Sequence, residues 1–213
     1  MKSDGPKVTI AGRLSRRLGF SSVYRFTCFV VFGGLLFLFC LLHLEYLDFY
    51  GTFCGSRHGP GRAFPGECFY FLAWKPAEIG MLLHLWCVMP AGLLACVQFV
   101  PVVRRKAPWV HRVNGYVSMI LSLVGALAAV PTIPHVFGGG RLTESSMWIL
   151  ACMPIVAQVK AYIDIKNHRI AQHRAWMLRA WSYVRPTTHL LSGHNSAPIH
   201  MLHITNRYRE IER

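Results

Sequence analysis

The sequence predicts an all-α fold, a polytopic transmembrane helical bundle with about four spans. Hydrophobic residues make up 53% of the 213 residues and charged residues only 15%, whereas ordinary soluble domains carry about 25% charged residues. The charges are also segregated, because long uncharged runs alternate with short basic clusters. A lone segment in lipid has to satisfy its own backbone hydrogen bonds, so each apolar run is expected to be a helix.

Four apolar runs have the length of a membrane-spanning helix. The spans are expected at 26–44, 79–103, 113–137 and 147–163. Each is close to the roughly 20 residues that cross about 30 Å of hydrocarbon. The transmembrane domain is therefore placed at 26–183, after a basic N-terminal segment at 1–25.

Lysine and arginine counts predict the direction of insertion. Segments 1–25, 104–112 and 160–185 carry six, four and six of these residues, whereas 45–78 and 138–146 carry three and one. Cytoplasmic loops are enriched in Lys and Arg, so we expect a cytoplasmic N-terminus and a non-cytoplasmic first loop. The basic N-terminus is also typical of a mitochondrial transit peptide, although an uncleaved first span is preferred.

The net charge of +14 indicates that the protein binds an anionic partner. The basic residues lie in short segments between apolar runs, where they set orientation and meet anionic head groups. The lipid bilayer is therefore the expected partner, and nucleic acid is not. Helix–helix partners or a homo-oligomer are also expected, because small residues recur along one face of the third run, at Gly115, Ser118, Ser122, Gly125 and Ala129. Such a face lets another helix, or a flat ligand, approach closely.

Two of the seven cysteines, Cys54 and Cys68, lie in the first loop. A disulfide is chemically permitted on the non-cytoplasmic side, and it would contribute roughly 3 kcal/mol. Two free thiols are the equally weighted alternative. The other five cysteines lie in the expected spans and are interpreted as small apolar packing residues.

Three features carry a resemblance to a known family: His84 inside a span, WVHRVNGYV at 109–117 and HRAWMLRAW at 173–181. They resemble an uncharacterised, predicted integral-membrane domain of bacteria and fungi, with HR-x-x-G-x-Y and HR-x-W-M-x-R motifs. The resemblance covers roughly 79–183 and implies a compact multi-span helical bundle, but no reaction. The positions that it carries over are His84, His111, Arg112, Gly115, His173, Arg174, Trp176 and Arg179.

The C-terminal segment 184–213 departs from that family pattern. Family members continue into a further hydrophobic span, whereas this segment is polar and holds Pro186 and Pro198. We expect a truncated or out-of-frame end that lacks the further span. A metal-binding tract is the other interpretation, although the spacings of its histidines fit no standard ligand set. These histidines are His189, His194, His200 and His203.

The stretch QHRAWMLRAW at 172–181 is expected to start a helix at the cytoplasmic interface. Its arginines would lie at head-group depth, and Trp176 and Trp181 are typical of an interfacial aromatic belt. The dipeptide HR also occurs at 111–112 and 168–169. All three pairs are expected on the cytoplasmic side, which suggests one common cause.

Histidines at two depths predict a cofactor site. His111 and His173 are expected near the cytoplasmic face, and His84 and His135 toward the outer face, where His43 also lies. Paired histidines on facing helices hold b-type haem, and neighbouring arginines can bind its propionates. The cofactor-binding candidates are His84, His111, His135, His173, Arg112 and Arg174. The metal-ligand candidates are His84, His111 and His173.

The favoured specific function is transmembrane electron transfer through bound haem b, with His84 as the most credible ligand. The alternative is a proton or small-solute transporter in which His84 and Gln98 line a polar path. A non-catalytic membrane assembly component is the third class. The sequence shows no phosphate-binding loop, catalytic triad or carboxylate pair, so hydrolase and kinase functions have no support.

Overall fold

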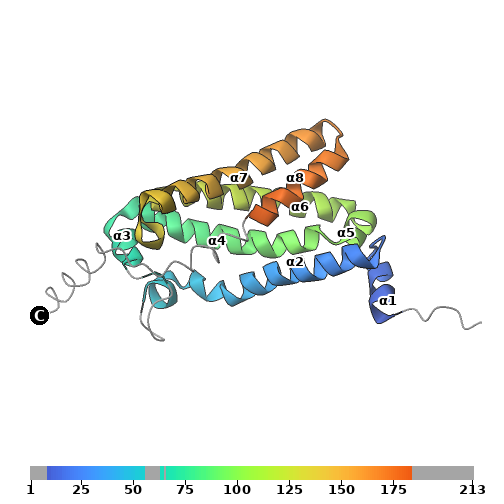
Figure 1. Cartoon of the computed structure of the whole chain (residues 1–213), viewed down its shortest axis with the longest axis horizontal. Helices are drawn as coiled ribbons and strands as arrows, with labels where there is room; N and C mark the ends of the chain where they lie inside the picture. Colours follow the sequence, from blue (N-terminus) through green and yellow to red (C-terminus); the bar gives the residue numbers. More distant parts are fainter. Residues whose placement is uncertain (1–8, 56–62, 65, 184–213) are drawn as a thin grey trace, which may run out of the picture. The chain divides into compact units, whose positions relative to one another are not determined.

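The computed structural model describes residues 9–55, 63–64 and 66–183, and this part of the chain is helical without a strand (Figure 1). The predicted all-α fold is confirmed. The C-terminal segment 184–213 lies outside the described residues. The longer helices are α1 (Ile10–Arg17), α2 (Val23–Leu42), α4 (Lys75–Gln98), α6 (Pro108–Ala128), α7 (Arg141–Lys166) and α8 (Ile170–Tyr183). Shorter elements are η1 (Leu44–Leu47), η2 (Phe49–Phe53), α3 (Glu67–Ala73), α5 (Pro101–Lys106) and η3 (Val130–Gly138).

Within the described residues, α2, α4 and α7 are long and apolar enough to cross a membrane. Helix α6 and η3 add a fourth candidate when this pair, bent by 60°, is counted as one span. The multi-pass membrane architecture is therefore confirmed. Compared with the expected span at 79–103, α4 begins four residues earlier, at Lys75, and ends at Gln98, because Pro101 opens the separate helix α5. Proline fits the first turn of a helix, since its missing N–H needs no partner there.

The expected span at 113–137 is interrupted near its end. Helix α6 stops at Ala128, and η3 continues at an angle through Pro131 and Pro134. Each proline removes a backbone donor and fixes φ, which breaks the regular helical ladder. Phe137 then takes a left-handed φ of 52°. The span therefore ends as a bent 3₁₀ segment.

Helix α2 shows how these helices meet their surroundings. Ser22 caps it, because its side-chain oxygen accepts the Arg25 N–H at 3.3 Å. Many of its large apolar side chains are exposed, such as Phe32 at 60% and Leu42 at 62%. A soluble protein rarely exposes a continuous apolar surface of this kind. In a bilayer the same surface faces lipid.

The chain divides into two compact units. Unit 1 contains Met1–His43 and Met89–Leu121. Polar side chains of α6 hold the second half of α4 there: Ser118 Oγ donates to the Ala91 carbonyl at 3.3 Å. Asn114 Nδ2 donates to the Leu94 carbonyl at 3.0 Å. These hydrogen bonds join two spans through backbone oxygens already engaged in helix.

Unit 2 contains Leu44–Val88 and Ser122–Arg213, and glycines let its helices approach closely. A Cβ on Gly80 would lie 2.4 Å from the Ala128 carbonyl oxygen, and one on Gly125 would lie 2.6 Å from Val88 Cγ2. Side-chain and backbone atoms of the facing helix therefore fill the space at Gly125. Within this unit, the small residues serve helix packing. Helices α7 and α8 also lie side by side in it (Figure 1).

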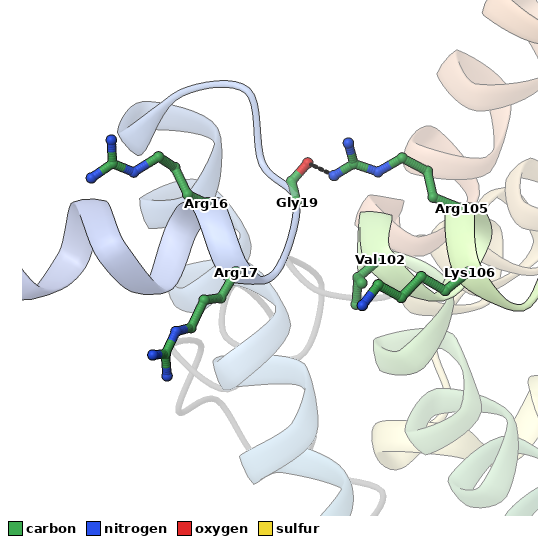
Figure 2. Close-up of a pocket in the computed structure, with 6 residues that line it drawn as sticks. All are labelled: Arg16, Arg17, Gly19, Val102, Arg105 and Lys106. Carbon is green, nitrogen blue, oxygen red and sulfur yellow. Dashed lines mark hydrogen bonds between the residues drawn. The ribbon is translucent and has the colours of Figure 1, made fainter.

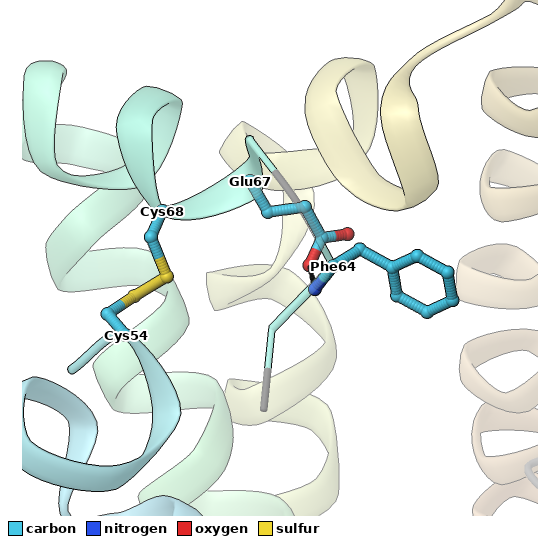
Figure 3. The surroundings of a disulfide bond; sticks show 4 residues. All are labelled: Cys54, Phe64, Glu67 and Cys68. Carbon is cyan, nitrogen blue, oxygen red and sulfur yellow. Dashed lines mark hydrogen bonds between the residues drawn. A yellow bond between two sulfur atoms is a disulfide. The ribbon is translucent and has the colours of Figure 1, made fainter. Parts of the chain in front are cut away.

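The first loop contains the disulfide that the sequence left open. Cys54 and Cys68 are joined, with their Cα atoms 5.5 Å apart (Figure 3). The bond links the residue after η2 to the second residue of α3. It therefore ties η2 to α3. Of the seven cysteines, the other five are free thiols.

Candidate functional site

His84 lies on α4 with its imidazole fixed by a neighbouring helix. Its Nδ1 is 2.8 Å from the carbonyl oxygen of Gly125. A carbonyl only accepts hydrogen bonds, so Nδ1 carries the hydrogen and Nε2 of the neutral ring keeps its lone pair. In the 24-residue helix Lys75–Gln98, His84 is about 4 Å along the axis from the midpoint. A basic nitrogen is thus held near the middle of a membrane span.

A partly buried polar pair lies about one turn before Gly125 on α6. Ser122 Oγ donates to Gln158 Oε1 of α7 at 2.8 Å, and Gln158 is 4% exposed. Ser122 precedes Gly125 by three residues, which is about 4.5 Å along the helix. The His84 ring and the Ser122–Gln158 pair therefore occupy successive levels of unit 2.

The next levels follow α7 toward its end. His173 Nδ1 of α8 is 2.8 Å from the Ala161 carbonyl oxygen, and Ala161 follows Gln158 by three residues. One turn later, the buried Asp164 carboxylate lies 4.0 Å from Arg169 Nη1. We call His84, Ser122, Gln158, His173 and Asp164 the polar column. Its two histidine levels are about 9 Å apart along the helices.

The other expected cofactor residues have separate surroundings. The His135 ring packs 4.4 Å from the Tyr70 ring, beyond the bend that follows α6. His84 contacts Gly125 instead, so the two rings lie against different elements. His111 belongs to unit 1, where its carbonyl accepts Gln98 Nε2 at 2.7 Å. The side chains of Arg112 and Arg174 are exposed.

Among the residues that the structure describes, no group of three or more His, Cys, Asp or Glu side chains could hold a metal ion. Within unit 2, His84 and His173 of the polar column each keep a lone pair on Nε2.

The three HR pairs do not share one structural role. His168 has a left-handed φ of 58° and lies in the turn between α7 and α8. Histidine is among the residues that tolerate this conformation better than most. His173 instead holds Ala161 through its ring. In the same helix, Arg179 lies over the Trp176 ring at 4.6 Å, which explains an arginine beside aromatic residues.

Glu67 is a buried carboxylate that the sequence analysis did not single out. It is 5% exposed, and its two oxygens accept the backbone N–H groups of Phe64 at 3.0 Å and Phe137 at 2.5 Å. Figure 3 shows the Phe64 contact beside the disulfide. Burial raises the pKa of the Glu67 carboxyl above its ordinary 4.5, and the two hydrogen bonds oppose this rise. The position of Glu67 next to Cys68 was the only feature of the sequence that pointed to this residue.

Gln158 was the other polar residue that the sequence analysis missed. It lies inside the expected span at 147–163, and a side-chain amide within an apolar run is costly unless it is paired. That cost was the signal for a partner helix. Ser122, the partner, was interpreted only as a small residue for packing.

Comparison with known proteins shows which family this chain belongs to. "Ava biosynthesis cluster protein G" of Aspergillus versicolor is 25% identical over 139 residues, which cover 58% of this chain and 39% of that protein. The chain thus spans well under half of this curated relative. No solved structure matches this chain. A family model described as "Predicted membrane protein (DUF2306)" matches residues 81–209, which extends past the expected limit at 183. The chain therefore belongs to this family of membrane proteins, a domain of unknown function.

Proposed function

We propose that this membrane domain carries out proton-coupled transport, with His84 as the residue that binds and releases the proton. The observation that carries this proposal is the Nδ1–H bond to the Gly125 carbonyl at 2.8 Å. That bond fixes the tautomer, so a proton is taken up at Nε2. An ionisable residue within a span is a functional candidate by default, because its charged form is costly in lipid.

The polar column supports a route for the proton through unit 2. Ser122 and Gln158 lie between the His84 and His173 levels, and both side chains can donate and accept hydrogen bonds. Steps of about 4.5 Å along the helices exceed one direct hydrogen bond, so bridging water molecules would complete the route. Asp164 then offers a carboxylate at the end of the column.

The interrupted span supports transport rather than a purely structural role. Helix α6 and η3 are bent by 60°, and the break follows Gly125 by about one turn. Transporters build binding sites from discontinuous helices, because unwound backbone offers free polar groups.

Proton flux in proteoliposomes tests the proposal. Vesicles with entrapped pyranine would be driven by a valinomycin-clamped potassium potential, for the wild type and for His84→Gln. We expect flux through His84→Gln to fall by roughly tenfold or more, the scale of a lost proton-transfer group. The matched control is His135→Gln, since that ring packs on Tyr70. Wild-type flux no higher than that of protein-free vesicles, or equal flux in both variants, would overturn the proposal.

Haem-linked electron transfer is the second candidate, and one observation favours it. His84 and His173 both tie Nδ1 to a backbone carbonyl at 2.8 Å, as histidine ligands of metals commonly do. Their levels differ by about 9 Å, so each would serve a separate haem. The close approach of Val88 to Gly125 leaves no room for a flat ligand at that glycine. A bound haem would supply one-electron redox chemistry.

An optical spectrum separates the two candidates. The purified protein, expressed with full haem supply, would be measured oxidised and dithionite-reduced. Soret and α bands that disappear in His84→Ala would support haem. A featureless spectrum, combined with flux that depends on His84, would support proton-coupled transport.

A further inference from the structure

A cationic pocket lies in unit 1, where the end of α1 meets α5 (Figure 2). Its volume is about 410 Å³. Four of its lining residues are basic, and the other two are Gly19 and Val102. The basic residues are Arg16, Arg17, Arg105 and Lys106. We propose that this pocket binds the phosphate of an anionic phospholipid head group at the membrane surface.

Two hydrogen bonds build the pocket from two segments that are far apart in the sequence. The Val102 N–H donates to the Leu18 carbonyl at 3.1 Å, and the Arg105 guanidinium donates to the Gly19 carbonyl, 86 residues away. Gly19 has a left-handed φ of 84°, which lets the chain turn sharply after α1. A Cβ at this position would lie 1.7 Å from Arg105 Nη2. The glycine thus leaves room for the guanidinium.

The charges in the pocket are not neutralised by a described carboxylate. Ion pairs within the described part of the chain join Lys75 to Glu78 and Arg169 to Asp164, and neither includes a pocket residue. Helix dipoles account for basic residues in the last turns of α1 and α5. They do not account for both sets lining one cavity. An anion would relieve the repulsion between them.

Phosphate suits the donors on offer. Arg105 uses a guanidinium N–H for Gly19, and a guanidinium carries five such donors in a planar fork that matches phosphate oxygens. In Figure 2, Arg105 and Lys106 reach from α5 toward α1, whereas Arg16 and Arg17 project outward. The side chains of Arg16 and Arg17 are exposed, so a phosphate that enters the pocket is accessible to them.

The flanking helix indicates that the phosphate belongs to a lipid. Ile10 and Leu14 of α1 are 77% and 46% exposed, and their spacing of four places them on one helix face. The span α2 begins at Val23, shortly after α1 ends at Arg17. An apolar face beside basic residues is typical of a helix that lies in the head-group region. Helix α1 would therefore hold the pocket at head-group depth.

Binding of short-chain lipids to the full-length protein in detergent tests the proposal. The probes are dioctanoyl phosphatidic acid, dioctanoyl phosphatidylcholine and inorganic phosphate, titrated by calorimetry. We expect saturable binding of the phosphatidic acid alone. The double variant Arg17→Gln/Arg105→Gln should weaken that binding by roughly tenfold or more, the scale of lost charge-assisted hydrogen bonds. The matched control is Arg13→Gln/Arg104→Gln, which removes the same charge from α1 and α5 outside the pocket lining.

A variant that keeps every charge separates pocket geometry from net charge. Gly19→Ala displaces Arg105, so it should also weaken binding of the phosphatidic acid. Equal losses in the control and pocket double variants would mean general attraction to basic surface, which overturns the proposal. Equal affinity for inorganic phosphate would assign the pocket to a soluble phosphate and overturn the lipid assignment. If none of the three probes binds saturably, the proposal is overturned as well.

Discussion

Glu67 Oε1 accepts the backbone N–H of Phe137 at 2.5 Å, across 70 residues of sequence. The contact joins α3, next to the disulfide, to the end of the bent segment η3. Rings of Phe64 and Phe137 meet edge to face at the same place, with centroids 5.0 Å apart. One buried carboxylate thus links the first loop to the interrupted span.

Substitution Glu67→Gln should remove a pH dependence of stability. Burial raises the pKa of this carboxyl above its ordinary 4.5, so protonation is easier in the folded protein than in the unfolded chain. Stability from the neutral form is then fully present below pH 4.5 and is lost as the pH rises through the higher folded pKa. We expect the melting temperature of the wild type to fall relative to Glu67→Gln over that window. Parallel melting curves from pH 4 to 8 would contradict this expectation.

Removal of the disulfide should destabilise the first loop without abolishing membrane insertion. Cys54 and Cys68 are 14 residues apart, and closure of such a loop contributes roughly 3 kcal/mol. Cys54→Ser/Cys68→Ser should therefore unfold at a lower temperature in detergent. Alkylation of the denatured, unreduced wild type should label five cysteines, and reduction should raise the count to seven. Seven labels before reduction would show that the bond is absent.

The coarse fold could be predicted from the sequence because spans depend on local composition. The runs that became α2 and α7 are apolar enough to be recognised without any partner. The disulfide stayed open because loop position permits a bond between Cys54 and Cys68 but does not give the distance between them. The early end of α4 depended on Pro101, a local signal that the apolar run concealed.

The candidate site was harder to predict because its parts meet only in the folded chain. His84 was recognisable as an intramembrane histidine, yet its partner is the Gly125 carbonyl, which no side-chain pattern reveals. Depth alone suggested a pairing of His84 with His135. The bend after α6 places His135 against Tyr70 instead. The burial of Glu67 likewise depends on Phe137, far along the chain.

Substitution Gly125→Ala should disturb the contact between α4 and α6 in unit 2. The added Cβ would lie 2.6 Å from Val88 Cγ2 and 3.2 Å from Cys87 Cβ. Overpacking of this kind costs about 1–3 kcal/mol, so we expect a lower unfolding free energy in a mild denaturant titration. Gly34→Ala in α2 is the control, because a Cβ there meets nothing within 4 Å. Equal effects of the two substitutions would contradict close packing at Gly125.

Ser122→Ala and Gln158→Leu should destabilise the protein to different extents, although the coupling energy between the two side chains is small. Ser122→Ala removes the donor of the 2.8 Å hydrogen bond and leaves the buried Gln158 carbonyl without it, which is costly. Gln158→Leu leaves the Ser122 hydroxyl, which can turn to its own helix carbonyl four residues earlier. We therefore expect Ser122→Ala to destabilise more than Gln158→Leu.

A double-mutant cycle in bicelles measures the coupling directly. Hydrogen bonds between spans contribute about 0.6 kcal/mol on average, because the unfolded state in the membrane also finds partners. The unfolding free energies of the two single variants and the double variant should thus depart from additivity by about that amount. This departure from additivity is expected even if Ser122 and Gln158 serve helix packing alone. A loss of proton flux in Gln158→Leu beyond what its change in stability explains would instead indicate that the polar column is the proton route. Strict additivity would mean that the two side chains do not interact in the membrane.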